Sequence, residues 1–247
     1  MKTNCFLLTL TILAISAAAQ SQGDPKLTEI WSPVPKVITP GTPGFTGAPS
    51  DAIVLYSGKK DSDKWIGKDG SAFKWATGET EFTAVEKAGD IKTKQGFGDC
   101  QLHIEWRTPA VVKGDGQGRG NSGIFFMGRY ELQVLDNYNN VTYSNGQAGS
   151  IYKQRIPLVN ACRPPGEWQV YDVIFTAPRF GADSMVKSPA RITVIHNGVL
   201  VQNNIEIWGP TEYIGIPKYV QHANKEPIVL QDHGNPTSFR NIWIREL

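Results

Sequence analysis

Strict alternation of polar and apolar side chains runs through residues 101–107 and predicts a β-strand with two unlike faces. One face carries Leu102, Ile104 and Trp106, which we expect to build a hydrophobic core. The other aligns an amide, an imidazole, a carboxylate and a guanidinium at the ~7 Å repeat of same-side strand residues; these are Gln101, His103, Glu105 and Arg107. A merely solvated face would suit Thr, Ser or Lys, so this mixture indicates a face that binds a polyol and moves protons.

Similar β-type runs follow one another after residue 50, separated by turn signals and without an amphipathic helical period. We expect strands at residues 52–56, 73–76, 101–107, 122–127, 130–135, 169–175, 190–196, 199–201, 228–231 and 239–245. Asn197-Gly198 lies between two of these runs and predicts a type I′ hairpin, with His196 as a hairpin-end residue. The pattern therefore predicts a single all-β domain.

Two N-terminal segments do not share this pattern. Residues 1–19 have a charged start at Lys2, a short apolar run and a small-residue exit at Ala19, which is typical of a secretory signal peptide. We therefore expect an exported protein, periplasmic or secreted. Residues 20–50 are rich in proline and glycine, which disfavours helix and predicts an extended arm that packs along the domain. The β-domain itself is expected over residues 51–247.

Charge and cysteine content narrow the function classes. The net charge is +2, or +1 without Lys2, so nothing here attracts nucleic acid or anionic lipid. No second apolar run approaches the ~18 residues needed for a membrane span. The exported chain would keep Cys100 and Cys162, for which a disulfide and two buried thiols are equally open. Without a CxxC motif or a Cys/His pairing, a structural zinc site is not expected.

A second group of polar residues lies on the expected strand at residues 130–135. Glu131 and Gln133 share one face, and Asp136 joins them only if the strand ends or bulges there. If Glu131 and Glu105 lie on neighbouring strands of one sheet, the pair would also suit a conventional two-carboxylate glycosidase. The polar stretch at residues 138–155 is a candidate wall of a cleft.

A third group ends the strand at residues 228–231. Gln231 and His233 share a face, and His233 is a candidate general base because imidazole titrates near neutral pH. For Asp232 and Asn235 a capping or turn role is at least as good an interpretation as catalysis.

Five motifs in this order resemble the 3-keto-disaccharide hydrolase domain family: GDCQLHIEWR (98–107), GRGNSGI (118–124), YELQVLD (130–136), HNGV (196–199), and LQDHGN (230–235) with FRNIW (239–243). The resemblance runs from about residue 50 to the end. It implies a concanavalin-like jelly-roll β-sandwich with a sugar cleft on its concave face. It also implies action on glycosides already oxidised to a ketone at C3.

Such a ketone acidifies the C2 hydrogen, so a base can remove this hydrogen and an enolate forms. The glycosidic oxygen then leaves C1 by elimination. Water finally adds to the unsaturated product. For this route we expect His233 or Glu105 as base, Arg107 or Arg240 as enolate stabiliser and Glu131 as acid. Residues expected to position the sugar are His103, Asn121, Gln133, Asp136 and Gln231. A divalent metal ion held by His103, Glu105 and Glu131 or His233 is the alternative enolate stabiliser.

Two other interpretations remain open at the level of sequence. One is a non-catalytic carbohydrate-binding sandwich, because fold does not determine function. The other is the two-carboxylate glycosidase, which would act on unoxidised glycosides. Ionisable groups stacked on adjacent strand faces favour an enzyme over a binding module, and a carbohydrate is the expected partner in all three cases.

Overall fold

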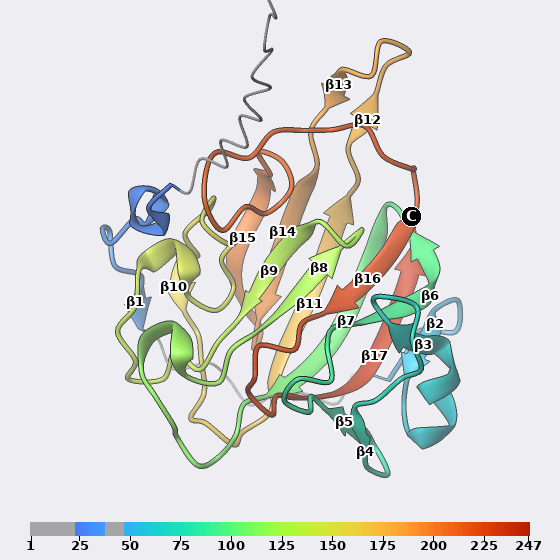
Figure 1. Ribbon diagram of the computed structural model, residues 1–247, viewed down its shortest axis with the longest axis vertical. Helices are drawn as coiled ribbons and strands as arrows, with labels where there is room; N and C mark the ends of the chain where they lie inside the picture. The colour runs from blue at the N-terminus through green and yellow to red at the C-terminus, as the bar shows by residue number, and fades with distance from the viewer. Residues whose placement is uncertain (1–22, 38–46) are drawn as a thin grey trace, which may run out of the picture.

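Two antiparallel β-sheets packed face to face form the body of the protein in the computed structural model, which describes residues 23–37 and 47–247 (Figure 1). The larger sheet has eight strands; in order across the sheet these are β15 (Val199–Glu206), β14 (Arg191–His196), β11 (Gln169–Thr176), β7 (Cys100–Arg107), β17 (Ser238–Glu246), β5 (Glu81–Thr83) and β4 (Ala76–Thr77), and β2 (Ile53–Tyr56) also pairs with β17. The smaller sheet has five strands, β3 (Trp65–Gly67), β6 (Ile91–Phe97), β16 (Glu226–Leu230), β8 (Ser122–Phe126) and β9 (Tyr130–Val134).

Short elements complete the architecture. Two small two-stranded sheets pair β1 (Lys36–Val37) with β10 (Val159–Asn160) and β12 (Arg179–Phe180) with β13 (Val186–Ser188). The helical elements are 3-10 turns, η1 (Pro25–Thr28), η2 (Lys59–Lys64), η3 (Gly116–Gly118) and η4 (Ser144–Gly146). In the part of the chain that the structure describes, no helix is long and apolar enough to cross a membrane. The expected all-β fold of the concanavalin-like jelly-roll class is confirmed.

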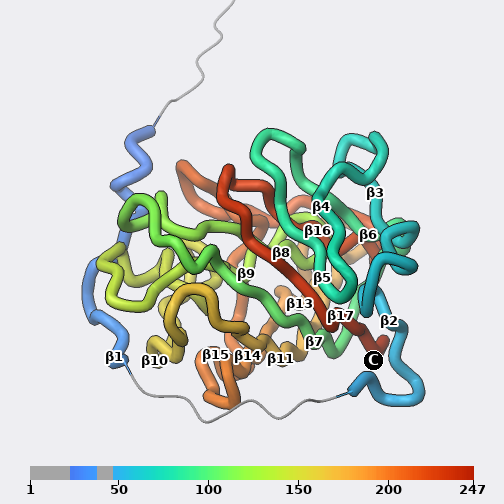
Figure 2. Tube along the Cα trace, turned by 90° about the horizontal axis from the view of Figure 1, so that it is seen from below, coloured from blue at the N-terminus to red at the C-terminus, as the bar shows by residue number. Residues whose placement is uncertain are grey.

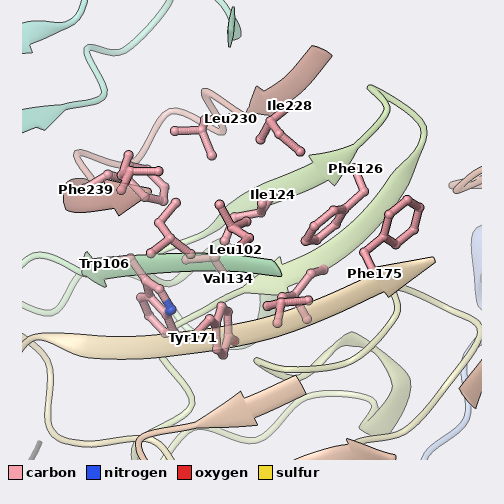
Figure 3. Packing of buried hydrophobic residues seen from close by; sticks show 14 of the residues in the cluster. Leu102, Trp106, Ile124, Phe126, Val134, Tyr171, Phe175, Ile228, Leu230 and Phe239 are labelled. Carbon is pink, nitrogen blue, oxygen red and sulfur yellow. The ribbon is translucent and has the colours of Figure 1, made fainter. Parts of the chain in front are cut away.

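The hydrophobic core lies between the two sheets and takes alternate residues from each strand (Figure 3). From the larger sheet, β7 contributes Leu102, Ile104 and Trp106, as their alternation predicted. From the smaller sheet, β9 contributes Leu132 and Val134. Burial of apolar surface at ~25 cal/mol per Å² makes this inward placement the dominant constraint on each strand. The residues between them must therefore point away from the core.

Nine of the ten expected strands are present, with ends shifted by a few residues. The expected strand at residues 73–76 is wrong, because β4 begins only at Ala76. The sequence also failed to reveal β6, whose inward positions include Thr93 as well as Ile91 and Phe97, while Lys94 and Gln95 are exposed. A polar residue at an inward position hides the apolar period on which strand prediction depends.

The turn after β14 has the predicted hairpin geometry. Asn197 and Gly198 have φ of 52° and 82°, as both central residues of a type I′ turn require. His196 ends the strand and is fully buried between the rings of Trp106 and Tyr171. The open question about the cysteines is also answered, since Cys100 and Cys162 are both buried and free.

The N-terminal arm packs on the loop that follows β9 (Figure 2). Asn145, fully buried in η4, accepts a hydrogen bond from the Ile30 backbone N–H at 3.0 Å and donates one to the Thr28 carbonyl at 3.0 Å. Ser144 N–H donates to the Ile30 carbonyl at 2.7 Å. The expected packing of the arm is thus seen for residues 23–37. The expected signal peptide at residues 1–19, and residues 20–22 and 38–46 of the arm, lie outside the described residues.

We expect Asn145→Ala to loosen the arm near Ile30 while leaving the sandwich folded. The substitution removes two hydrogen bonds and leaves the Ile30 N–H without its acceptor, which should lower the free energy of unfolding by about 1 to 3 kcal/mol. Limited proteolysis followed by mass spectrometry should find earlier cleavage near Ile30 in the variant. Equal cleavage rates in the two proteins would show that these bonds do not hold the arm.

Candidate functional site

A cavity of about 360 Å³ lies on the outer face of the smaller sheet and collects several of the polar residues singled out above. We call it the polar cavity; it is lined by Asn121, Phe125, Glu131, Gln133, Tyr152, Thr211, Tyr213, Gln231 and His233. Its floor consists of β8 and β9, and the segment after β16 forms its rim. Five of the ten residues expected in the site are thus brought together: Asn121, Glu131, Gln133, Gln231 and His233.

Strand alternation explains why Glu131 and Gln133 are in this cavity. Leu132 and Val134 point into the core, so the residues between them face outward. On β8, Gly123 pairs with Gln133, and a Cβ built on Gly123 would lie only 2.6 Å from Glu131 Oε1. Glycine at this position therefore leaves the room that the glutamate side chain occupies.

The Glu131 carboxyl is held in an environment that favours its protonated form. Its side chain is buried, and it makes no hydrogen bond or ion pair with the described residues. Burial raises the pKa of Glu131 to about 8; the nearby Asp90 carboxylate adds to the rise and Lys68 opposes it. A carboxyl group that keeps its proton near neutral pH can serve as a general acid.

Two amide side chains in the cavity carry unused hydrogen-bond acceptors. Gln133 Nε2 donates to Gln117 Oε1 at 3.1 Å and to Asn121 Oδ1 at 3.3 Å, while Gln133 Oε1 is buried without a partner. Gln231 Oε1 is likewise buried and unpaired. An unsatisfied buried acceptor costs about 1 to 3 kcal/mol, which a ligand hydroxyl could recover by donating to it. The cavity is therefore suited to a polyhydroxylated ligand.

His233 lies at the exposed rim, on a loop that its neighbours fix in place. Asp232 accepts hydrogen bonds from Gly234 N–H at 2.9 Å and Gly89 N–H at 3.0 Å, while its own N–H donates to Asp90 at 3.0 Å. Asp232 thus has the structural turn role that the sequence left open. The loop holds an imidazole beside the cavity that contains Glu131.

Sequence reasoning missed the aromatic wall of the polar cavity. Tyr152 comes from the 138–155 stretch that was expected to wall a cleft, and Tyr213 from the loop after β15. The hydroxyl groups of Tyr152 and Tyr143 are 2.6 Å apart, and burial raises the pKa of Tyr152 to about 12. Lys153 Nζ donates to the carbonyls of Tyr213 and Pro25, so it links both the second tyrosine and the arm to this wall. Aromatic residues in a polar loop were the only sequence signal for this wall.

The polar face of β7 lies on the opposite side of the molecule. Because Leu102, Ile104 and Trp106 fill the core from the larger sheet, His103 and Glu105 point out of that sheet and away from the polar cavity. The condition under which Glu105 and Glu131 would suit a two-carboxylate glycosidase is not met, since β7 and β9 belong to different sheets.

On that outer face His103 and Glu105 belong to a dense network that we call the His103 cluster: His103, Glu105, Asp172, Arg240, Asn241 and Trp243. A bulge in β17, where Asn241 has φ of 44°, places Arg240 and Asn241 on the same side. Arg240 Nε donates to Glu105 Oε2 at 2.6 Å and Asn241 Nδ2 to Glu105 Oε1 at 2.8 Å. Trp243 stacks on the His103 ring with centroids 5.2 Å apart.

Hydrogen bonds decide the charge states in the His103 cluster. Burial alone lowers the pKa of His103, but its 2.6 Å contact with Asp172 and the neighbouring Glu105 carboxylate raise it to about 9. Burial alone raises the pKa of Glu105, but contacts with His103, Asn241 and Arg240 lower it to about 2. The cluster is therefore a set of opposite charges that neutralise one another on a buried sheet surface.

The two arginines expected to stabilise an enolate are also remote from the polar cavity. The Arg107 and Arg240 guanidinium groups lie 4.6 and 4.0 Å from the centre of the Trp168 ring, on the face of the His103 cluster. Asp136 lies beyond the end of β9, where it accepts a hydrogen bond from Arg119 Nε at 2.6 Å.

The proposed metal site fails for the same reason. Its four candidate ligands divide between two outer faces, with His103 and Glu105 on the larger sheet and Glu131 and His233 at the polar cavity. Across residues 23–37 and 47–247, no three His, Cys, Asp or Glu side chains form a group that could hold a metal ion.

Comparison with known families adds to this geometry. Residues 51–245 match the 3-keto-alpha-glucoside-1,2-lyase-like domain. The chain belongs to this family. The match runs from β2 into β17 and therefore includes all strands that line the polar cavity. No curated protein matches the chain.

Solved structures share the fold. A "putative glycosyl hydrolase" from Parabacteroides distasonis is 54% identical, with a TM-score of 0.80, over 90% of this chain and 96% of that chain. Two further structures described in the same words, from the same organism, are 19% and 22% identical, with TM-scores of 0.57 and 0.53. Each covers 79% of this chain, and the coverage of their own chains is 94% and 99%. At these identities they show the shared fold alone.

The His103 cluster should make stability depend on pH. The folded-state pKa of His103, about 9, lies above the ordinary histidine value of 6.5. Protonated His103 therefore contributes its full stabilisation below pH 6.5, and this contribution is lost as the pH rises toward 9. Asp172→Asn should bring the His103 pKa down and flatten this dependence. Urea unfolding across that pH range, with NMR titration of His103, measures both effects. An unchanged His103 pKa in the variant would contradict the role given to Asp172.

Proposed function

We propose that this protein cleaves glycosides whose sugar ring carries a ketone at C3, and that the polar cavity is its active site. The observation that carries the proposal is Glu131, a buried carboxyl with a pKa of about 8, in a cavity lined by amides, tyrosines and an imidazole. Membership of the 3-keto-alpha-glucoside-1,2-lyase-like family supports a carbohydrate substrate and this reaction class. The 54% identical "putative glycosyl hydrolase" supports action on a glycosidic bond.

His233 and Glu131 supply the two proton transfers that the reaction needs. The C3 ketone acidifies the C2 hydrogen, and His233 at the cavity rim takes that proton, which leaves an enolate. Collapse of the enolate breaks the C1–O bond and forms a C1–C2 double bond. Glu131 gives its proton to the departing oxygen, so the aglycone leaves as an alcohol. Water then adds across the double bond of the 2-hydroxy-3-keto-glucal and yields the free 3-keto sugar.

The enolate oxygen needs hydrogen-bond donors, and Arg107 and Arg240 are too remote to provide them. Tyr152 and Gln231 both line the polar cavity and take this role in our proposal. The Tyr143 and Tyr152 hydroxyls share one hydrogen bond in which either can be the donor. With Tyr143 as the donor, the Tyr152 O–H is free to donate to the substrate. Donors that are already oriented stabilise a developing oxyanion without reorganisation during the reaction.

The alternatives have less support. A conventional glycosidase needs two carboxyl groups about the scissile bond, whereas Glu131 is the one carboxyl among the described residues that line the polar cavity. A binding module would use the same amides and tyrosines, but it has no use for a buried, protonated carboxyl.

Glu131→Gln tests the acid. It should lower kcat/KM for a 3-keto-glucoside by about a hundredfold to ten-thousandfold, because the amide cannot donate a proton to the leaving oxygen in the same way. In the wild type, kcat/KM should fall as the pH rises above about 8, where Glu131 loses its proton. The assay follows aglycone release from a 3-keto-glucoside and from its unoxidised parent.

The outcomes of this assay separate the three functions. Release from the ketone alone supports elimination, and deuterium at C2 should then slow it. Release from the unoxidised parent would indicate a conventional glycosidase, and binding without release would indicate a binding module. Glu167→Gln, which changes an exposed carboxyl before β11, is the matched control and should behave as wild type. A fully active Glu131→Gln enzyme would contradict the assignment of Glu131.

Gln231→Leu tests the unpaired acceptor. The substitution keeps the backbone hydrogen bond from residue 231 to Gly123 but removes the whole side-chain amide. Loss of the acceptor for a sugar hydroxyl should raise KM about tenfold, and loss of the donor to the enolate oxygen should lower kcat as well. Steady-state kinetics measure this, with the thermal midpoint as a check on folding, and an unchanged KM would place the sugar elsewhere in the cavity.

A further inference from the structure

A second cavity, of about 770 Å³, lies at the end of the sandwich. We call it the apolar cavity. Its walls carry Ala84, Val85, Pro109, Val111, Val112 and Pro236. Val85, Val111 and Val112 are 41%, 72% and 45% exposed, so three aliphatic residues present surface at one opening. Its volume is within the range of ligand sites in proteins, about 300 to 1,000 Å³.

The two cavities lie on either side of one wall. Gly120 lines the apolar cavity and the next residue, Asn121, lines the polar cavity; likewise Gly234 follows His233 across the same boundary. Asn121 N–H donates to Asn235 Oδ1 at 3.0 Å, which ties the two segments of the wall together. Gly120 has φ of 55°, and a Cβ there would lie 2.9 Å from Thr108 Cβ, so this segment approaches its neighbours closely. The wall is therefore narrow and fixed in place.

The chemistry of the apolar cavity does not suit a second sugar ring. None of its described lining residues is aromatic, whereas the polar cavity has one phenylalanine and two tyrosines. Its two most buried charged side chains, Arg119 and Asp136, satisfy each other at 2.6 Å. Of the other polar lining residues, Thr83 and Asn235 already bond Ser238 and Asn121, and Glu86 and Lys113 are exposed to solvent. Aliphatic side chains gain from contact with apolar groups, whereas a hydroxylated ring would find few ordered partners to replace its hydrogen bonds to water.

We propose that the apolar cavity binds the leaving group of the substrate, and that this leaving group is an apolar aryl or alkyl aglycone. The inference rests on the proposed function, because it needs the sugar ring in the polar cavity with its C1 substituent directed across the wall at residues 233–235. The substrate class is then a 3-keto-glucoside of an apolar alcohol or phenol, in preference to a 3-keto-disaccharide.

Val112→Asp tests the apolar cavity by placing a charge on its wall. Val112 is half exposed and lines only this cavity, so the variant should fold. In isothermal titration with phenyl and methyl glucosides, each as α and β anomer, the wild type should bind a phenyl glucoside about tenfold more tightly than the corresponding methyl glucoside. Val112→Asp should abolish this preference, and its affinity for the methyl glucoside should stay within about twofold of the wild-type value. The control variant Val220→Asp changes an exposed valine that lines neither cavity, and it should keep the preference for the phenyl glucoside.

Kinetics with the matching 3-keto-glucosides keep this inference separate from the proposed function. If both hold, Val112→Asp raises KM for the phenyl substrate about tenfold and leaves kcat/KM for the methyl substrate unchanged. If no 3-keto-glucoside is cleaved, the proposed function fails, and the binding comparison still decides the occupant of the apolar cavity. Absence of a phenyl preference in the wild type, or its survival in Val112→Asp, would overturn the inference.

Discussion

Burial of one face of every strand between two sheets is the constraint on which the rest of the structure depends. Leu102, Ile104 and Trp106 on β7 and Leu132 and Val134 on β9 meet in the same core. Because side chains alternate along a strand, inward placement of these residues forces His103 and Glu105 out of one side of the molecule and Glu131 and Gln133 out of the other. The hydrophobic effect therefore separates two polar clusters that look alike in the sequence.

The two outer faces of the sandwich differ in chemistry because different residues cover them. On the larger sheet, Asp172, Arg240 and Asn241 satisfy His103 and Glu105, and Trp243 covers the imidazole, so the charges there are matched. On the smaller sheet, loops rise around β8 and β9 but leave Glu131 without a partner. The same residue type consequently has a pKa of about 2 at Glu105 and about 8 at Glu131. A buried carboxyl with a raised pKa beside open space is the arrangement that the proposed general acid needs.

Most strands could be predicted because the apolar period is strong in β7, β8, β9, β11, β14 and β17. It fails in β6, where Thr93 takes an inward position. Residues 73–76 do alternate between more buried and exposed side chains, but of these only Ala76 pairs with a neighbouring strand, so alternation alone predicted a strand that the backbone does not form. Half of the expected site residues, including Glu131 and His233, do line one cavity. Tyr152 and Tyr213 could not be found, because they come from irregular loops whose paths depend on the arm, Lys153 and other distant contacts.

The sequence by itself determined the all-β class, the inward and outward face of the main strands, the type I′ hairpin and the family to which the chain belongs. These properties are local or follow from residue order. Only the tertiary structure decided that Glu105 and Glu131 face opposite ways, that the cysteines stay free, and that a wall at residues 120–121 and 233–235 separates a polar from an apolar cavity. Alternation determines which side chains point away from the core, but the sheet to which each strand belongs determines the side of the molecule on which they lie.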